Sequence, residues 1–260
     1  MMAVPIYVVS LLKDKERRKK ISDDFKKIDI DFSFYDAIDA KCSENKTLIE
    51  EVRLSGGDAA EMSDGEIACA LSHRSVYHDF LIKNHNWAII LEDDVIIDDQ
   101  LGYFFDLLNS EKINKLNNDD LYILGGQKGL HDYPVIATSL FTFVDFGKIK
   151  LRRVTYNQHK IRRTCSYLIS QEMCGKILNL AKKDGIFRAD DWKRMKRNGV
   201  INNFFLSEII EHPIVCELNS HLEAERNLRT INKKSPRSKV NLFLKKSRAW
   251  LRTFFFSFSA

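Results

Sequence analysis

The chain has 260 residues, of which 44% are hydrophobic and 30% charged, and its formal net charge is +5. That length suits one large domain or two small ones, and the composition is that of an ordinary globular protein. Collagen-like, low-complexity and polytopic membrane proteins are excluded, and the small numbers of Gly (11) and Pro (4) disfavour a turn-rich all-β fold.

Positive charge is concentrated at the C-terminal end. Residues 226–260 contain ten Lys or Arg and no Asp or Glu, so residues 1–225 carry a net charge of −5. We therefore divide the chain into a domain at 1–225 and a basic tail at 226–260, and we expect the tail to attract anions.

The cysteines and the N-terminus bear on the cellular compartment. Five widely spaced cysteines without a C-x-x-C pair indicate reduced thiols and neither a disulfide framework nor a zinc site. The N-terminal apolar run is too short for a signal peptide and precedes its basic residues, and no stretch reaches the ~18–20 apolar residues of a spanning helix. We expect a cytoplasmic protein.

Strands and helices alternate along the N-terminal half. The apolar, β-branched and helical patterns predict strands at 5–12, 32–35 and 87–91, and helices at 14–28, 63–83 and 102–108. Ser63 and Glu66 form a capping-box pattern at the start of the second helix. The polar residues 41–60 are expected to form a loop.

The C-terminal half is less regular. The pattern predicts strands at 121–124 and 165–170 and a helix at 172–183. Strand-like and basic pieces alternate over 127–165 without a clear assignment, and Pro213 marks 209–216 as an edge strand. The alternation of strands and helices predicts an α/β fold with a mixed, largely parallel sheet.

Three carboxylates, Glu92, Asp93 and Asp94, follow the predicted strand 87–91 directly. Open α/β sheets bind ligands beyond the carboxyl ends of their strands, and strand alternation puts Glu92 and Asp94 on one side. Two such carboxylates suit Mg²⁺ or Mn²⁺, with substrate phosphates completing the coordination. The alternative is a solvated strand end or a helix cap.

Two further clusters could carry chemistry. Glu66, Cys69 and His73 share one face of the predicted helix 63–83, although a hydrogen-bonded core histidine is the alternative for His73. Asp190 and Asp191 precede Trp192, so they could supply a general base beside a ring on which a sugar stacks. A helix N-cap is the alternative for this acidic pair.

The tail carries its own helical pattern. Apolar residues recur with helical spacing from Val240 to Phe258, and Lys245, Lys246, Arg248 and Arg252 mark the other side. A basic amphipathic helix with Phe and Trp is typical of helices that lie on a membrane surface. The alternative is a C-terminal helix docked on the domain core.

Together these segments resemble glycosyltransferase family 25, whose members include lipooligosaccharide galactosyltransferases of Gram-negative bacteria and related collagen-modifying domains. The matching segments are PIYVVSLLKDKERRKKI, EMSDGEIACALSH, WAIILEDDV, TCSYLIS, RADDW and HPIVCELNSH, in the family's order over about residues 4–222. GEIACALSH and ILEDD are specific in combination. One departure is His221, which follows Ser220 where the family tends to place an acidic residue.

The resemblance implies a GT-A-like, Rossmann-type nucleotide-sugar-binding fold, with a UDP-sugar held through Mn²⁺ or Mg²⁺ and inversion at the anomeric carbon. The implied residues are Asp94, Glu92 and His221 for the metal; Glu92, Asp93, Arg17, Glu66 and His73 for the UDP-sugar; and Asp190, with Asp191 as second candidate, for the catalytic base.

We therefore expect residues 1–225 to be an inverting, metal-dependent glycosyltransferase, with galactose from UDP-galactose as the favoured sugar. The expected acceptor is a lipooligosaccharide or lipopolysaccharide at the inner face of the bacterial inner membrane, where 238–260 would contact anionic lipid. The alternative is a non-catalytic adaptor that binds membrane or nucleic acid through its tail. The negative charge of residues 1–225 argues against nucleic acid.

Overall fold

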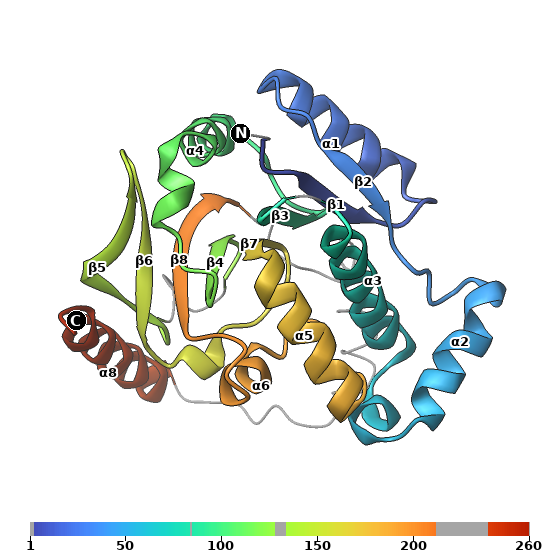
Figure 1. Cartoon of the computed structure of the whole chain (residues 1–260). Coiled ribbons are helices and arrows are strands. Elements are labelled where there is room, and N and C mark those ends of the chain that lie inside the picture. The colour runs from blue at the N-terminus through green and yellow to red at the C-terminus, as the bar shows by residue number, and fades with distance from the viewer. Residues whose placement is uncertain (1–2, 84, 128–133, 212–238, 260) are drawn as a thin grey trace.

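The computed structural model describes residues 3–83, 85–127, 134–211 and 239–259. It is an α/β protein built around one eight-stranded sheet with the order β2-β1-β3-β7-β4-β8-β6-β5 (Figure 1). The strands are β1 (Ile6–Ser10), β2 (Ser33–Asp36), β3 (Trp87–Glu92), β4 (Asp120–Gly125), β5 (Ala137–Phe146), β6 (Ile149–Tyr156), β7 (Ser166–Ser170) and β8 (Asn203–Ile210).

Helices cover both faces of this sheet. They are α1 (Lys15–Lys27), α2 (Ser43–Leu54), α3 (Asp64–Leu81), α4 (Asp99–Asn109), α5 (Gln171–Asp184), α6 (Trp192–Arg197) and α8 (Lys239–Ser257), with short 3₁₀ turns η1 (Gly57–Glu61), η2 (Glu111–Lys115) and η3 (Gln158–Lys160). Apolar side chains of α3, α5 and α6 form one core with the sheet, and those of α1 and α4 form a second core on the opposite face. Every residue of β1 and β7 is buried, as in strands that lie inside a sheet between two helical layers.

The sheet is mixed, as predicted, but it is not largely parallel. Among the described strands, β1–β2, β1–β3 and β4–β8 pair in parallel, whereas β3–β7, β4–β7, β6–β8 and β5–β6 are antiparallel. The region that resisted assignment, 127–165, contains the β5–β6 hairpin. A hairpin needs no crossover helix, so the β-α-β alternation that predicts parallel neighbours does not apply to this part of the chain.

One further prediction was wrong, and a second was wrong in the part that the structure describes. The expected loop 41–60 contains α2 and η1, because this polar segment buries Ile49 and Ala59 in a small core against α3. Of the edge strand expected at 209–216, residues 209 and 210 belong to β8, which lies inside the sheet between β4 and β6. Residues 212–216, with Pro213, lie outside the described residues.

The amphipathic helix expected in the tail is α8, and one side of it packs on β5 and β6 (Figure 1). Thr155 Oγ1 donates a 2.7 Å hydrogen bond to the Phe256 carbonyl, and the Tyr156 ring stacks on Phe256 with 4.3 Å between centroids. Among the described helices, none combines the length and the apolar character that crossing a bilayer requires. The division of the chain at residue 225 stays a prediction.

Candidate functional site

The carboxyl ends of β1 and β3 lie side by side, because these strands pair in parallel with Val9 opposite Glu92. From β1 the chain moves to β2 on one side, and later to β3 on the other, so the strand order reverses here. Such a reversal opens a crevice beyond the strand ends, which is where α/β sheets bind ligands. A pocket of about 170 Å³ lies at this point, between the strand ends, the β1–α1 connection and α3.

All three predicted carboxylates line this pocket. Glu92 ends β3, and Asp93 and Asp94 follow it. Burial alternates along the triplet, since Asp93 is only 8% exposed and its two neighbours are half-buried. This alternation agrees with strand geometry, in which Glu92 and Asp94 point to one side. Asp93 is therefore the carboxylate that belongs to the wall of the pocket.

Asp93 holds Arg17 at the same pocket. Its carboxylate accepts hydrogen bonds from Ser10 Oγ at 2.6 Å and from the Arg17 guanidinium at 3.0 Å. Burial raises the pKa of the Asp93 carboxyl, and the two hydrogen bonds oppose that rise only in part. Lys13 and Lys41 also line the pocket, so carboxylates and cations face one small volume.

His73 is buried inside a chain of aromatic hydroxyls. Its side chain is 1% exposed, and its Nδ1 lies 2.7 Å from Tyr167 OH, which in turn lies 2.8 Å from Tyr77 OH. Burial raises the pKa of both tyrosines, so both hydroxyls stay protonated. On its Nδ1 side, His73 is thus a hydrogen-bonded core histidine, which was the alternative to a role in a site.

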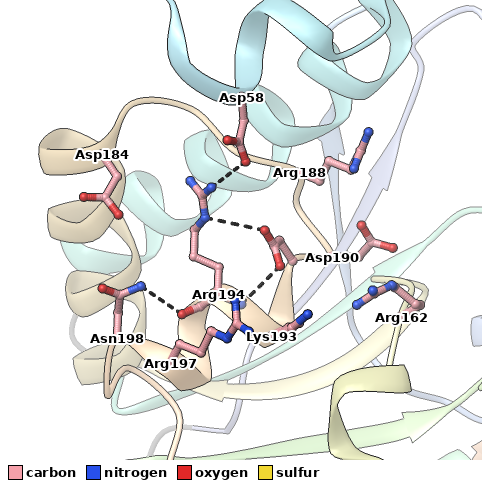
Figure 2. Close-up of a pocket in the computed structure, with 10 residues that line it drawn as sticks. Asp58, Arg162, Asp184, Arg188, Asp190, Lys193, Arg194, Arg197 and Asn198 are labelled. Carbon is pink, nitrogen blue, oxygen red and sulfur yellow. Dashed lines mark hydrogen bonds and ion pairs between the residues drawn. The ribbon is translucent and has the colours of Figure 1, made fainter.

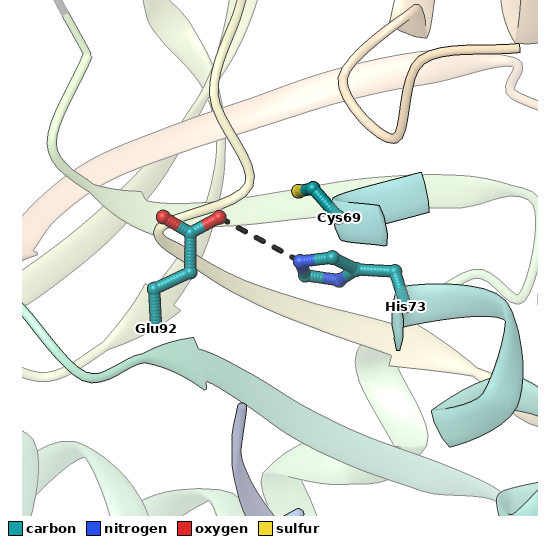
Figure 3. Close-up of side chains that lie close together, drawn as sticks. All are labelled: Cys69, His73 and Glu92. Carbon is teal, nitrogen blue, oxygen red and sulfur yellow. Dashed lines mark ion pairs between the residues drawn. The ribbon is translucent and has the colours of Figure 1, made fainter. Parts of the chain in front are cut away.

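The other side of the ring faces a carboxylate and a thiol. His73 Nε2 lies 3.6 Å from Glu92 Oε1 and makes no hydrogen bond within the described part of the chain (Figure 3). The ligand atoms of Cys69, His73 and Glu92 all lie within 4.8 Å of one another. Sequence analysis did not name Cys69 among the candidate site residues, although it placed Cys69 on the same helix face as His73. The signal was the i, i+4 spacing on α3, which puts the two side chains one turn apart.

Glu66 lies at the start of α3. Its backbone N–H donates to Ser63 Oγ at 3.1 Å, while its Oε2 accepts from the Ser63 N–H at 3.0 Å, which confirms the predicted capping box. Its Oε1 accepts from Arg188 Nε at 3.0 Å. In the part of the chain that the structure describes, Glu66 does not line the first pocket. It connects α3 to the segment that precedes Asp190.

A second, wider pocket of about 700 Å³ contains Asp190 and Asp191 (Figure 2). Asp191 is the N-cap of α6, because its side chain accepts from the Arg194 N–H at 3.1 Å. Arg194 also donates to Asp58 at 2.6 Å. Asp190 makes a different contact, since its Oδ2 accepts from the Arg163 N–H at 3.1 Å. The N-cap alternative therefore applies to Asp191 and not to Asp190.

Trp192 is fully buried, so the suggestion that it stacks on a sugar is wrong. Its ring packs edge-on against Tyr167, and its Nε1 donates to the Arg163 carbonyl at 3.1 Å. The sequence alone does not tell whether an aromatic ring next to two carboxylates packs in the core or binds a sugar. The tryptophan thus holds the backbone of Arg163, whose N–H donates a hydrogen bond to Asp190.

The segment Arg163-Thr164 connects the two pockets. Thr164 Oγ1 donates to Glu92 in the first pocket, and the Arg163 N–H donates to Asp190 in the second. Arg163 has a φ of 70°, an unusual value for a residue with a side chain. Sequence analysis missed this connection, because no spacing pattern reports a contact between segments 72 residues apart. His221 lies outside the described residues.

Comparisons with known proteins agree on one family. The family model described as "Glycosyltransferase family 25 (LPS biosynthesis protein)" matches residues 3–192. A putative glycosyltransferase of Haemophilus influenzae is 36% identical over 45% of this chain and 39% of its own length. The lipooligosaccharide biosynthesis protein lic2B of Haemophilus influenzae is 27% identical over 64% of this chain and 59% of its own. A glycosyltransferase 25 family member of Aedes aegypti is 31% identical over 35% of this chain and 16% of its own. The chain thus spans less than two thirds of these relatives.

Proposed function

The chain belongs to glycosyltransferase family 25, and we propose that it transfers a sugar from a UDP-sugar to a lipooligosaccharide or lipopolysaccharide acceptor. The observation that carries this proposal is the pocket at the carboxyl ends of β1 and β3, where Glu92, Asp93 and Asp94 lie with Arg17 and Lys13. Carboxylates that can hold a divalent cation, beside cations that can meet phosphate oxygens, suit a nucleoside diphosphate.

We assign the metal to Glu92 and Asp94, with Mn²⁺ or Mg²⁺ as the ion. The donor chemistry around them fits a divalent cation, since His73 Nε2 is buried beside Glu92 without a hydrogen bond in the described part of the chain. A cation bound there would neutralise the charge that builds on the two phosphates as UDP leaves. His73 can join the ligands only with the proton on Nδ1, where it donates to Tyr167.

We assign the general base to Asp190, with Asp191 as second candidate. The acceptor hydroxyl must lose a proton as it attacks, and inversion requires a base on the face of the sugar opposite UDP. The Arg163 N–H fixes the Asp190 carboxylate, and the next residue, Thr164, fixes Glu92. One short segment thus positions the proposed base relative to the proposed metal ligand. The larger second pocket is our candidate for the acceptor site.

Galactose, transferred with inversion from UDP-galactose, is the favoured sugar because of the family resemblance. A lipid-linked acceptor places the reaction at a membrane, and we propose the cytoplasmic face of the bacterial inner membrane. The basic residues of the tail fit this location, because anionic lipid attracts each nearby Lys or Arg by about 1 kcal/mol.

Turnover of a panel of UDP-sugars on a short oligosaccharide acceptor tests the function. We expect transfer with one UDP-hexose in the presence of Mn²⁺, loss of transfer in EDTA, and recovery when Mn²⁺ is restored. Full activity in EDTA would overturn the metal dependence. Absence of UDP binding with and without Mn²⁺ would overturn the enzyme and favour the non-catalytic adaptor.

A further inference from the structure

Helix α8 presents different side chains to the sheet and to solvent. At 100° per residue, Ala249, Thr253 and Ser257 fall on one side. Thr253 there is buried, and this side packs on β5 and β6. The side that faces the protein is therefore made mainly of small residues. Phe256, which stacks on Tyr156, also faces the sheet, but most of the other large apolar side chains of the helix point elsewhere.

Those side chains form an exposed sector. It consists of six residues that are 49–69% exposed: Leu244, Trp250, Leu251, Phe254, Phe255 and Phe258. Phe254 packs edge-on against both Phe255 and Phe258, with ring centroids 6.1 and 5.1 Å apart. A contiguous apolar patch of this kind on a protein surface marks an interaction site.

The sector continues onto the sheet. Phe141 of β5 is 65% exposed, and its ring centroid lies 6.2 Å from that of Phe258. We call these seven side chains, Phe141 from β5 and six from α8, the aromatic surface. Its two parts are more than 100 residues apart in sequence, so only the fold brings them together.

A cationic edge runs along the aromatic surface. On the helical wheel, Lys245, Arg248 and Arg252 lie together on the side of the exposed sector that is away from β5, and all three are exposed. No acidic residue occurs between 226 and 260 to neutralise them. The helix thus offers large apolar rings and, beside them, positive charge without a local counter-charge.

We propose that the aromatic surface and its cationic edge form one docking face for an anionic lipid bilayer. The rings enter the boundary between headgroups and acyl chains, and the three cations meet lipid phosphates. The proposal deepens the proposed function, on which it rests for the reason to visit a membrane. The binding itself requires neither donor nor acceptor.

A second copy of the chain fits this face less well than lipid does. In a symmetric dimer the same patch meets itself, and the tail of the second copy would offer no acidic residue to the cationic edge of the first. Like charges in one interface oppose association. An anionic bilayer instead supplies an apolar layer and negative charge at the same time. We therefore take an anionic bilayer, and not a second copy of the chain, as the partner of this face.

Vesicle flotation with the full chain tests the surface. We expect binding to vesicles of phosphatidylglycerol and phosphatidylcholine, and about tenfold weaker binding for Phe141→Ser and for Phe255→Ser, since each removes an exposed ring that the bilayer would bury. Ile82→Ser is the matched control, because Ile82 is 83% exposed at the end of α3, outside the aromatic surface. It should bind as the unmodified chain does. Arg248→Gln should lower binding to anionic vesicles roughly fivefold and leave binding to neutral vesicles unchanged.

Each outcome supports or overturns the proposal. If Phe255→Ser weakens binding and Phe141→Ser does not, the tail alone is the anchor and the joint surface is wrong. If the chain does not bind vesicles and instead forms a dimer that Phe255→Ser dissociates, the partner of this face is a second copy of the chain. Flotation of an inactive protein would overturn the proposed function and leave the docking face standing, whereas an active protein that does not float would do the reverse.

Discussion

At the scale of single residues, the structure separates carboxylates that sequence analysis had grouped. Asp191 caps α6, whereas Asp190 is held by the Arg163 backbone. Asp93 bonds Ser10 and Arg17, whereas Glu92 faces His73 and Thr164. Adjacent acids therefore have different tasks, because each neighbour in sequence points to a different part of the fold.

Asp190→Asn should lower kcat on the order of 10²–10⁴-fold, since the amide keeps the shape but cannot accept the proton. Its affinity for UDP, measured by calorimetry, should stay unchanged because the base faces the acceptor. Asp99→Asn, which alters an exposed acid that lines neither pocket, is the control and should be active. If Asp190→Asn is active and Asp191→Asn is dead, the base is Asp191; if both are active, it lies elsewhere.

The metal assignment can be tested with two substitutions. Asp94→Ala should abolish Mn²⁺-dependent UDP binding, while Asp99→Ala, an exposed acid five residues on, should not. Cys69→Ser should keep Mn²⁺-dependent binding, because Mn²⁺ prefers oxygen ligands to a thiol. Calorimetry with and without Mn²⁺ measures both. The reverse pattern, with Cys69→Ser defective and Asp94→Ala normal, would move the site to Cys69, His73 and Glu92.

At the scale of elements, strands and helices were predicted best from sequence where their side chains are almost all buried or where a cap marks their start. The strands β1 and β3 are almost wholly apolar, and α3 has a capping box, so both signals are local. The direction of β7 and the position of β8 are not local properties. They depend on which distant strands each of them pairs with, and α2 was missed because its helical face buries few residues.

The same reasoning explains what could be foreseen of the site. The triplet 92–94 was found because an apolar strand leads directly into it. The Thr164–Glu92 bond, the Tyr167–His73 contact and the burial of Trp192 join distant segments, so no spacing could report them.

Truncation after Glu225 should leave a folded body that still binds UDP and Mn²⁺, because neither pocket is lined by α8 in the described residues. The shortened protein should melt at a lower temperature, since the Tyr156–Phe256 stack and the Thr155 hydrogen bond are lost. It should also lose vesicle binding, and its activity should fall more on a lipid-linked acceptor than on a soluble one. Circular dichroism melts and flotation measure these effects. An unfolded product would show that α8 belongs to the core.

At the scale of the whole molecule, the first pocket draws on several distant segments. Its lining comes from β1, the start of α1, the residues after β2, α3 and the end of β3. A ligand that contacts all of them stabilises the folded chain against unfolding, because the unfolded chain has no such site.

UDP with Mn²⁺ should therefore raise the melting temperature. At one hundred times its Kd, a ligand adds about 2.7 kcal/mol, and each kcal/mol shifts a domain of this size by roughly 2–4 °C. Thermal scans of the unmodified chain and of Asp94→Ala measure this. An equal shift for both proteins would contradict the assignment of Asp94 to the metal.

The docking of α8 on β5 and β6 has a consequence for reach. Five strand-to-strand steps of about 4.8 Å separate β5 from β3, so the strand that carries Glu92 lies roughly 24 Å across the sheet from the edge that bears Phe141. When the aromatic surface lies on lipid, the distance from the bilayer to the first pocket is fixed by the folded sheet and not by a flexible linker. If the proposed function holds, transfer would then be restricted to glycans whose growing end lies at about this distance from the bilayer, and shorter glycans would not reach the site.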